Sequence, residues 1–208
     1  MKRWLLLSFS LVLLGTLLLV DTEGEVKKDV EKNVAAAETA VLAGGCFWCV
    51  EADLEKVPGV ISVVSGYTGG RDANPTYENY AESGHIEAVE VRYDPRRITY
   101  EKLLEAFWKI IDPTDAGGQF VDRGPQYRSA IFYLNEEQRV LAEKSKAELA
   151  KSGRFDKPIV TEILKAGPFY PAEAYHQDYY QKSSLRYKFY RSGSGRDRFL
   201  KKVWGEKK

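Results

Sequence analysis

The sequence has few of the residues that build metal centres or disulfide frameworks. It contains two cysteines, Cys46 and Cys49, and two histidines, His85 and His176. Two cysteines so close together constrain an unfolded chain little, which argues against a disulfide-stapled fold. They cannot complete a four-ligand zinc site alone, and the histidines are more typical of structural hydrogen bonding than of metal binding. We therefore expect no bound metal and a redox role for the cysteine pair.

The sequence also lacks an internal repeat and a polybasic run, so nucleic acid is not an expected partner. Hydrophobic residues make up 44% and charged residues 29% of the 208 positions, which is typical of a globular protein. The length allows one core of ordinary size with a tail. We expect a monomer.

The N-terminus differs in composition from the rest of the chain. Lys2 and Arg3 precede an apolar run from Trp4 to Val20, so residues 1–20 are predicted to be a signal peptide or an N-terminal membrane anchor. No Ala-x-Ala site follows directly and no cysteine for lipid attachment lies at its end. The charged composition of residues 21–38 predicts a flexible linker. Residues 39–208 are predicted to form the catalytic domain. The expected location is extracytoplasmic: periplasmic, secreted or membrane-anchored.

Hydrophobic periodicity predicts the order β-α-β-β-α-β-α-β followed by a tail that wraps the domain. This order predicts an α+β fold, a ferredoxin-like two-layer sandwich of helices on a mixed β-sheet. Two long loops, of about 17 residues each, are compatible with it if they build an active site. The predicted strands are 39–44, 60–66, 85–93, 129–134 and 159–165, the helices 47–57, 99–111 and 136–151, and the loops 67–83 and 112–128.

The most informative stretch is Gly-Gly-Cys-Phe-Trp-Cys at residues 44–49. A strand is predicted to end at the glycines and a helix to begin near Cys46, where the helix dipole and free N–H groups favour a thiolate with a lowered pKa. Cys49 lies one turn later on the same face, so a disulfide between the two is sterically feasible. The alternative is an inert buried pair.

The dipeptide between the two cysteines helps to distinguish between the candidate functions. A bare C-x-x-C motif suggests a thioredoxin-like dithiol:disulfide oxidoreductase. Phe47 and Trp48 instead place two large rings beside the thiols, which suits a soft, apolar substrate group, unless both rings simply belong to the core. A membrane-tethered module that binds methionine-like side chains is a third, non-enzymatic alternative.

Further motifs follow in a fixed order from Thr39 to Tyr180, and together they resemble the peptide methionine sulfoxide reductases of the A type. They are GCFWCVE, SGYTGG, NPTY, GHIEAV, YDP, DRGPQYRSAIFY and FYPAEAYHQDYY. The resemblance implies reduction of methionine sulfoxide, free or in proteins, with selectivity for the S epimer at sulfur and a role in the repair of oxidised proteins.

The resemblance also implies roles for individual residues. Cys46 matches the nucleophile, and Glu87 matches the carboxyl group that protonates the sulfoxide oxygen, which requires a raised pKa. The residues that match the substrate pocket are Phe47 and Trp48 for the methyl group, Tyr77 and Tyr127 for the oxygen, and Asp122 for the surrounding polar network. The competing interpretations are a solvated strand glutamate for Glu87 and ordinary loop packing for the two tyrosines and Asp122.

The sequence departs from the family pattern at one point. Many members have glycine where Cys49 stands and carry resolving cysteines in the C-terminal tail, but here residues 167–208 contain none. Cys49 is therefore expected to attack the Cys46 sulfenic acid and form a disulfide. An external dithiol such as thioredoxin or dithiothreitol would reduce that disulfide, and no cofactor is expected.

Overall fold

The computed structural model describes residues 37–205, so the predicted signal segment and nearly all of the linker lie outside the described residues. Within these residues, no helix is both long and apolar enough to cross a membrane. The elements are β1 (Glu38–Gly44), α2 (Phe47–Leu54), β2 (Val60–Thr68), β3 (Ile86–Tyr93), α3 (Tyr100–Trp108), β4 (Gly118–Gln119), β5 (Asp122–Arg123), η1 (Pro125–Tyr127), β6 (Ser129–Tyr133), α4 (Glu136–Lys151), β7 (Glu162–Lys165), β8 (Tyr170–Pro171), α5 (Tyr179–Lys182), α6 (Ser184–Gly193) and α7 (Arg196–Trp204).

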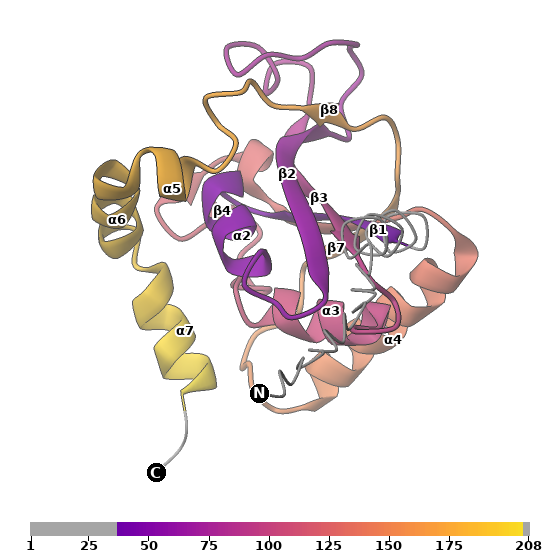
Figure 1. The fold of residues 1–208 in the computed structure, drawn as a ribbon. Helices are drawn as coiled ribbons and strands as arrows, with labels where there is room; N and C mark the ends of the chain where they lie inside the picture. Colours follow the sequence, from indigo (N-terminus) through magenta and orange to yellow (C-terminus); the bar gives the residue numbers. More distant parts are fainter. Residues whose placement is uncertain (1–36, 206–208) are drawn as a thin grey trace, which may run out of the picture.

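One mixed six-stranded sheet forms the centre of the molecule, with strand order β7-β6-β1-β3-β2-β8 (Figure 1). Only the β6–β7 pair is parallel, and the other pairs are antiparallel. The first four main strands and their two helices follow one another as β1-α2-β2-β3-α3-β6 and give the order β6-β1-β3-β2. This is the predicted ferredoxin-like α+β arrangement, extended at both edges by β7 and β8.

The sheet is buried on both faces, which explains why β1 reads as an uninterrupted apolar run. Leu42 and Val89 face a core built with α2, α3 and α4, whereas Val41 and Ala88 face a smaller cluster with Phe169. Each fully buried Leu or Val contributes roughly 1.5–3 kcal/mol. Side chains alternate along a strand, so Glu87 in β3 points to the helix side of the sheet, in the same direction as Val89.

Several helix ends follow from local hydrogen bonds. Thr99 and Asn135 cap α3 and α4: their side chains accept bonds from the backbone N–H groups of Lys102 and Gln138, at 3.4 and 2.8 Å. The helix predicted for 99–111 ends earlier, at Trp108, because the next two N–H groups bond to carbonyls three residues back, in a tightened last turn.

The helix predicted for 47–57 ends at Leu54, and the chain then turns through Pro58 to Gly59, whose φ is +101°. The last main strand starts at Glu162 instead of 159, because the N–H of Val160 bonds to the carbonyl of Pro113 and not to the sheet.

The two predicted long loops are ordered by local structure. β2 extends to Thr68, beyond its predicted end at 66, and the second loop contains the β4–β5 hairpin and η1. The side chain of Gln119 fastens the second loop, since its Oε1 accepts from the N–H of Asp112 and its Nε2 donates to the carbonyl of the same residue, at 2.8 and 2.7 Å.

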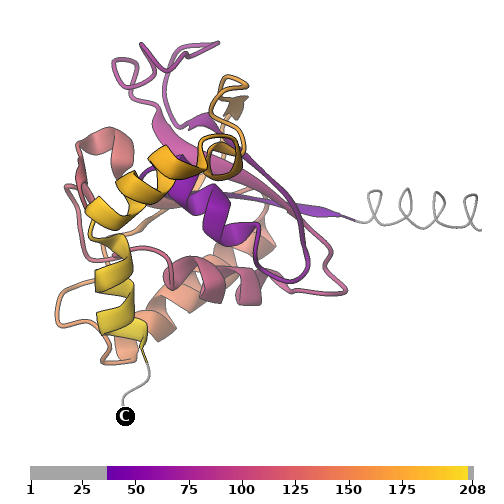
Figure 2. The same ribbon diagram turned by 60° about the vertical axis from the view of Figure 1, so that its left-hand side comes forward.

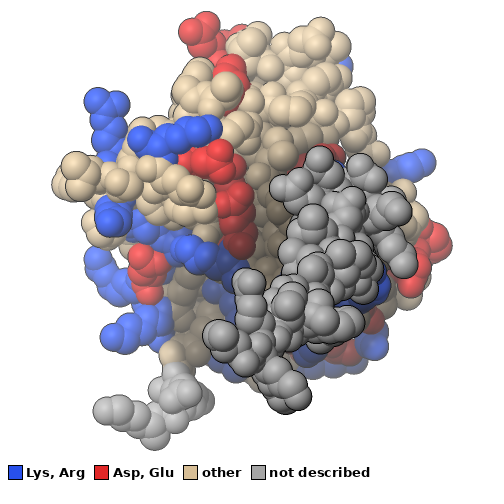
Figure 3. Space-filling view, viewed as in Figure 1, with Lys and Arg blue, Asp and Glu red and all other residues tan. Residues whose placement is uncertain are grey.

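The C-terminal tail wraps around the domain as predicted. β8 pairs with β2, and α5, α6 and α7 then pass along the side of the molecule next to α2 (Figures 1 and 2). This tail is strongly basic: residues 179–205 contain eight Lys or Arg and one Asp, whereas residues 37–178 contain 16 Lys or Arg and 23 Asp or Glu. Figure 3 shows these cations gathered over the C-terminal helices.

Candidate active site

Cys46 occupies the junction that the sequence predicted, between the end of β1 and the start of α2. It is the N-cap residue of α2, and its carbonyl accepts from the N–H groups of Cys49 and Val50, at 3.1 and 3.3 Å. The preceding Gly45 has a φ of +79°, and a Cβ there would lie 2.4 Å from the Cβ of Gln119. Only glycine satisfies both conditions, so the Gly-Gly pair sets the direction in which Cys46 enters the helix.

Glu87 is buried beside Cys46 and Phe47 and is not a solvated strand residue. It is 2% exposed, its Oε2 accepts from the N–H of Phe47 at 2.8 Å, and its Oε1 lies 3.0 Å from the hydroxyl of Tyr80. Burial raises the pKa of Glu87 to about 8, although both hydrogen bonds oppose the shift. The carboxyl group therefore keeps its proton at pH 7, as an acid catalyst requires.

The predicted site residues converge on one small cavity of about 100 Å³. Its lining contains Cys46, Phe47, Trp48, Tyr77, Glu87, Asp122, Tyr127 and Tyr190. The cavity thus brings together every predicted catalytic or substrate-binding residue except Cys49, and it adds Tyr190 from α6. Apolar rings, a protonated carboxyl group, phenols and a thiol all face the same space.

The two rings that follow Cys46 are held in fixed orientations. Phe47 is fully buried and packs against His176, with ring centroids 5.0 Å apart, so it belongs both to the core and to the pocket wall. The Nε1–H of Trp48 donates to Nδ1 of His176 at 3.0 Å, and its ring stacks on Tyr179 at 3.8 Å. A rigid apolar wall of this kind suits the methyl group of a methionine side chain.

The phenols of the pocket are neutral hydrogen-bond donors. Burial raises the pKa of Tyr77 and of Tyr127 above the ordinary value, so neither ionises near pH 7. The backbone N–H of Tyr77 donates to Glu173 at 2.9 Å, which fixes this otherwise exposed residue. Asp122 accepts a hydrogen bond from the hydroxyl of Tyr190, and burial raises the pKa of Asp122.

The cysteine pair corrects one expectation. Both residues are buried free thiols, and Cys49 is fully inaccessible behind Cys46. Burial and the neighbouring Cys49 raise the pKa of the Cys46 thiol well above its ordinary range, so the prediction of a lowered pKa at this position was wrong. The pKa of Cys49 is lowered to about 6, because Cys46 donates a hydrogen bond to it and the cations Arg196 and Arg191 lie nearby.

Sequence reasoning did not find four contributors to the site: Tyr80, Tyr190, His176 and Arg196. Both histidines are structural, as expected: Nδ1 of His85 accepts from the N–H of Gly70 at 3.1 Å, and His176 orients Trp48. The sequence contains 13 tyrosines, but nothing in it shows that the tail would place Tyr190 at the cavity.

One group of acidic residues lies apart from the cavity. Oxygens of Glu51, Glu55 and Asp178 come within 4.8 Å of one another in the described part of the chain. Two of these carboxylates accept hydrogen bonds from the segment that begins α5. Glu51 accepts from the N–H of Asp178 at 3.1 Å, and Glu55 accepts from the hydroxyl of Tyr180 at 2.6 Å. These hydrogen bonds hold α5 against α2, and none of the three residues lines the cavity.

Comparison with known proteins identifies the family. Residues 38–208 match the family model described as peptide methionine sulfoxide reductase. The chain is 58% identical over 172 residues to the peptide methionine sulfoxide reductase MsrA of Bacillus licheniformis, covering 82% of this chain and 95% of that one.

The fold of this chain is also similar to that of solved structures. The reduced form of Mxr1 from Saccharomyces cerevisiae is 31% identical, with a TM-score of 0.67 over 72% of this chain and 87% of that chain. A structure of Mxr1 in complex with Trx2 is 25% identical, with a TM-score of 0.50 over 70% of this chain and 86% of that chain. The pocket, the fold and these matches lead to one conclusion: the chain belongs to the peptide methionine sulfoxide reductase family.

Proposed function

We propose that this protein reduces the S epimer of methionine sulfoxide, free or in proteins, through a sulfenic acid at Cys46 that Cys49 resolves. The observation that carries the proposal is the cavity in which Cys46 lies beside a protonated, buried Glu87 and an apolar wall of Phe47 and Trp48. A sulfoxide sulfur becomes electrophilic when its oxygen receives a proton or strong hydrogen bonds. Glu87, Tyr77 and Tyr127 present such donors to one space.

In the first step, the sulfur of Cys46 attacks the sulfoxide sulfur while Glu87 gives its proton to the oxygen. The oxygen is then transferred from the substrate to Cys46, which leaves methionine and a sulfenic acid. The substrate is reduced by two electrons and the Cys46 thiol is oxidised by two. Phe47 and Trp48 hold the methyl group, and Asp122, bonded to Tyr190, completes the polar side of the pocket.

In the second step, the sulfur of Cys49 attacks the sulfur of the sulfenic acid. The S–O bond breaks, the disulfide forms and the oxygen leaves as water. A dithiol protein then reduces the disulfide by exchange. Two features support a thioredoxin in this role: the solved complex of the related Mxr1 with Trx2, and the absence of any third cysteine in this sequence.

The direct test is turnover of the separate S and R epimers with dithiothreitol as the reductant. We expect methionine from the S epimer only, and no turnover by Cys46→Ser. Equal turnover of both epimers would refute the stereochemical part of the proposal, and no turnover of either would refute the function.

We further propose that the enzyme works outside the cytoplasm as a monomer, either released after cleavage or anchored by residues 1–20. The support is the pair of cations followed by the apolar run from Trp4 to Val20. Fractionation of the expressing cell, with mass spectrometry of the N-terminus, tests both alternatives. Recovery of the intact chain in the cytosol would contradict this placement, and light scattering would test the monomer.

A further inference from the structure

Arg196 is a buried cation that forms no ion pair with a carboxylate among the described residues. It is the first residue of α7 and is 1% exposed. Its guanidinium donates to the carbonyls of Ile110 and Gly44, at 2.5 and 3.0 Å, and lies over the ring of Phe120, 4.5 Å from the centroid. Within residues 37–205, no carboxylate oxygen lies within 4.0 Å of it.

An arrangement of this kind is costly unless something anionic lies close by. Carbonyl groups satisfy the N–H donors of a guanidinium but do not offset its charge, and buried charges in proteins are normally paired. The carbonyl of Gly44 is at the end of β1, two residues before Cys46, so the guanidinium is fixed at the base of the Gly-Gly-Cys turn. The Cys46–Cys49 pair is the anionic group that this turn carries.

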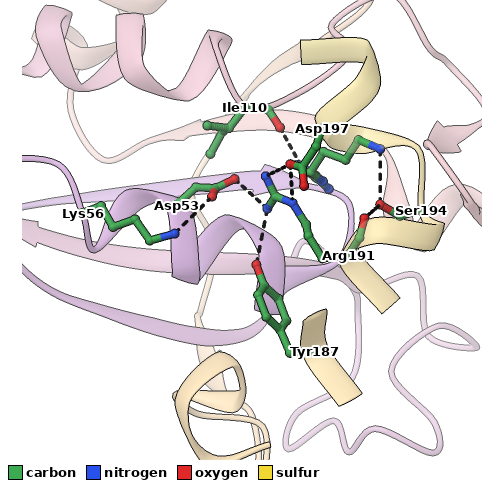
Figure 4. A network of polar contacts seen from close by, with 9 residues as sticks. Asp53, Lys56, Ile110, Tyr187, Arg191, Ser194 and Asp197 are labelled. Carbon is green, nitrogen blue, oxygen red and sulfur yellow. Dashed lines mark hydrogen bonds and ion pairs between the residues drawn. The ribbon is translucent and has the colours of Figure 1, made fainter. Parts of the chain in front are cut away.

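Arg191, the neighbouring cation in the tail, is different because its charge is offset locally. Its Nη1 lies 2.8 Å from Asp53 and 3.4 Å from the hydroxyl of Tyr187, and its Nε lies 2.7 Å from Asp197 (Figure 4). Two carboxylates therefore flank one guanidinium, which joins α2 to α6 and α7. Arg191 fastens the tail, whereas Arg196 contributes an uncompensated positive charge.

The geometry points to Arg196 as a positioning residue for the resolving step: its fixed charge holds Cys49 as a thiolate, ready to attack the sulfenic acid of Cys46. This inference rests on the proposed function of the cysteine pair. The other charged or titratable groups around Cys49 are Cys46 at the N-cap of α2, Asp53 of α2, Glu87 of β3, Tyr187, Tyr190 and Arg191 of α6, and Tyr179 and Tyr180 of α5. Asp53 opposes a thiolate at Cys49, and Asp122, which also feels the charge of Arg196, is itself engaged by Tyr190.

The chemistry of the resolving step explains what the charge supplies. The Cys49 thiolate forms the S–S bond, the S–O bond of the Cys46 sulfenic acid breaks, and the departing hydroxide takes one proton from solvent to become water. No further oxidant is needed, because the sulfenic acid already holds the two oxidising equivalents.

The inference is tested in a Cys46→Ala background, where Cys49 is the only thiol and its titration is not coupled to a second one. The titration is followed by thiolate absorbance and by the rate of alkylation across pH. Arg196→Gln keeps an N–H donor but removes the charge, Arg196→Lys keeps the charge but loses the planar fork, and Arg198→Gln removes an exposed cation from the same helix as the control. We expect Gln to raise the Cys49 pKa by about one unit or more and to slow alkylation about tenfold below that pKa. We expect Lys and the Arg198 control to change it little.

In the enzyme with both cysteines, Arg196→Gln should slow disulfide formation after the first turnover at low pH, and the deficit should disappear at high pH. Equal shifts in the Lys and Gln variants would show that shape and not charge matters, and would overturn the inference. An unshifted titration in Arg196→Gln would do the same.

If Arg196→Gln does not fold, titration of Cys49 in the Cys46→Ala protein still tests the inference. Because burial raises the pKa of Cys49 and the Cys46 hydrogen bond is absent there, a Cys49 pKa well above the ordinary value of about 8.5 would show that the surrounding cations do not offset burial, and would overturn the inference. These titrations need no sulfoxide turnover, so they separate a failure of this inference from a failure of the proposed function.

Discussion

Replacing Glu87 with glutamine is the most informative single change in the site. Glutamine keeps the shape, and its amide oxygen can still accept from the N–H of Phe47, but it has no transferable proton. With a pKa of about 8, the native carboxyl group is roughly 90% protonated at pH 7, so nearly all native molecules start with the acid in place. General acid catalysis contributes about 10²–10⁴-fold, and we expect the single-turnover rate to fall by that factor while substrate binding changes little.

The same substitution has an independent signature in stability. A carboxyl group with a pKa raised from 4.5 to about 8 in the folded state keeps its proton after the unfolded chain has lost it. The native protein therefore loses stability as pH rises from about 4.5 to about 8, by on the order of 5 kcal/mol. Glu87→Gln removes this dependence, so the variant should be more stable than the native protein at pH 8 and similar to it at pH 4.5.

Rapid-quench kinetics and urea unfolding at several pH values provide the two measurements. Glu90→Gln, three residues further along β3, is the control and should alter neither. A native single-turnover rate for Glu87→Gln at pH 7 would mean that Glu87 is not the acid and that Tyr77, Tyr127 or Asp122 supplies the proton. A stability profile that keeps its native pH dependence would mean that Glu87 is ionised in the folded protein.

Three other substitutions test the remaining steps. Cys46→Ser should abolish turnover in the dithiothreitol assay, and more than a few per cent residual activity would exclude Cys46 as the nucleophile. Cys49→Ser should release a burst of one methionine per enzyme, accumulate a sulfenic acid that a dione reagent traps, and lose thioredoxin-supported cycling; undiminished cycling would show that no internal disulfide is needed. Gly45→Ala should lower the free energy of unfolding in urea by more than about 1–3 kcal/mol, because the added Cβ meets Gln119 at 2.4 Å and the φ is +79°. Gly84→Ala, at φ +83° with no atom within 4 Å of the new Cβ, should show the backbone cost alone, and equal losses in the two variants would contradict the proposed clash.

The sequence was sufficient for features that depend on neighbouring residues. Residue alternation in 85–93 indicated a strand, and Glu136–Lys151 was predicted with the bounds that the structure has, where Asn135 caps the helix. The helix predicted for 99–111 was too long because its last turn tightens, which depends on how the following loop leaves it. Local pattern thus predicted which elements form, and tertiary contacts decided where they end.

In the candidate site, too, some features depend on neighbouring residues and others on tertiary contacts. The Gly-Gly-Cys turn is local, and Cys46 lies where the motif indicated. The electrostatics of the pair are not local. Helix-dipole reasoning lowers the pKa of Cys46, but burial and the neighbouring Cys49 raise it. The pKa of Cys49 is lowered by the hydrogen bond from Cys46 and by Arg196, which lies 150 positions after Cys46 in the chain. Tyr190 was missed for the same reason, since only the path of the tail brings it to the cavity.

The role that we propose for the basic tail depends on the position of Cys49. A resolving cysteine in a mobile tail can reach solvent to lose its proton, but Cys49 is fully buried on α2 and has no such access. Burial alone would keep it protonated and slow as a nucleophile. The tail contains no cysteine, but it brings Arg191 to Asp53 of α2 and Arg196 to the carbonyl of Gly44 at the end of β1. Its excess of cations faces a domain with an excess of anions. In the mechanism that we propose, the tail therefore supplies the charge that ionises Cys49, in place of a resolving cysteine of its own.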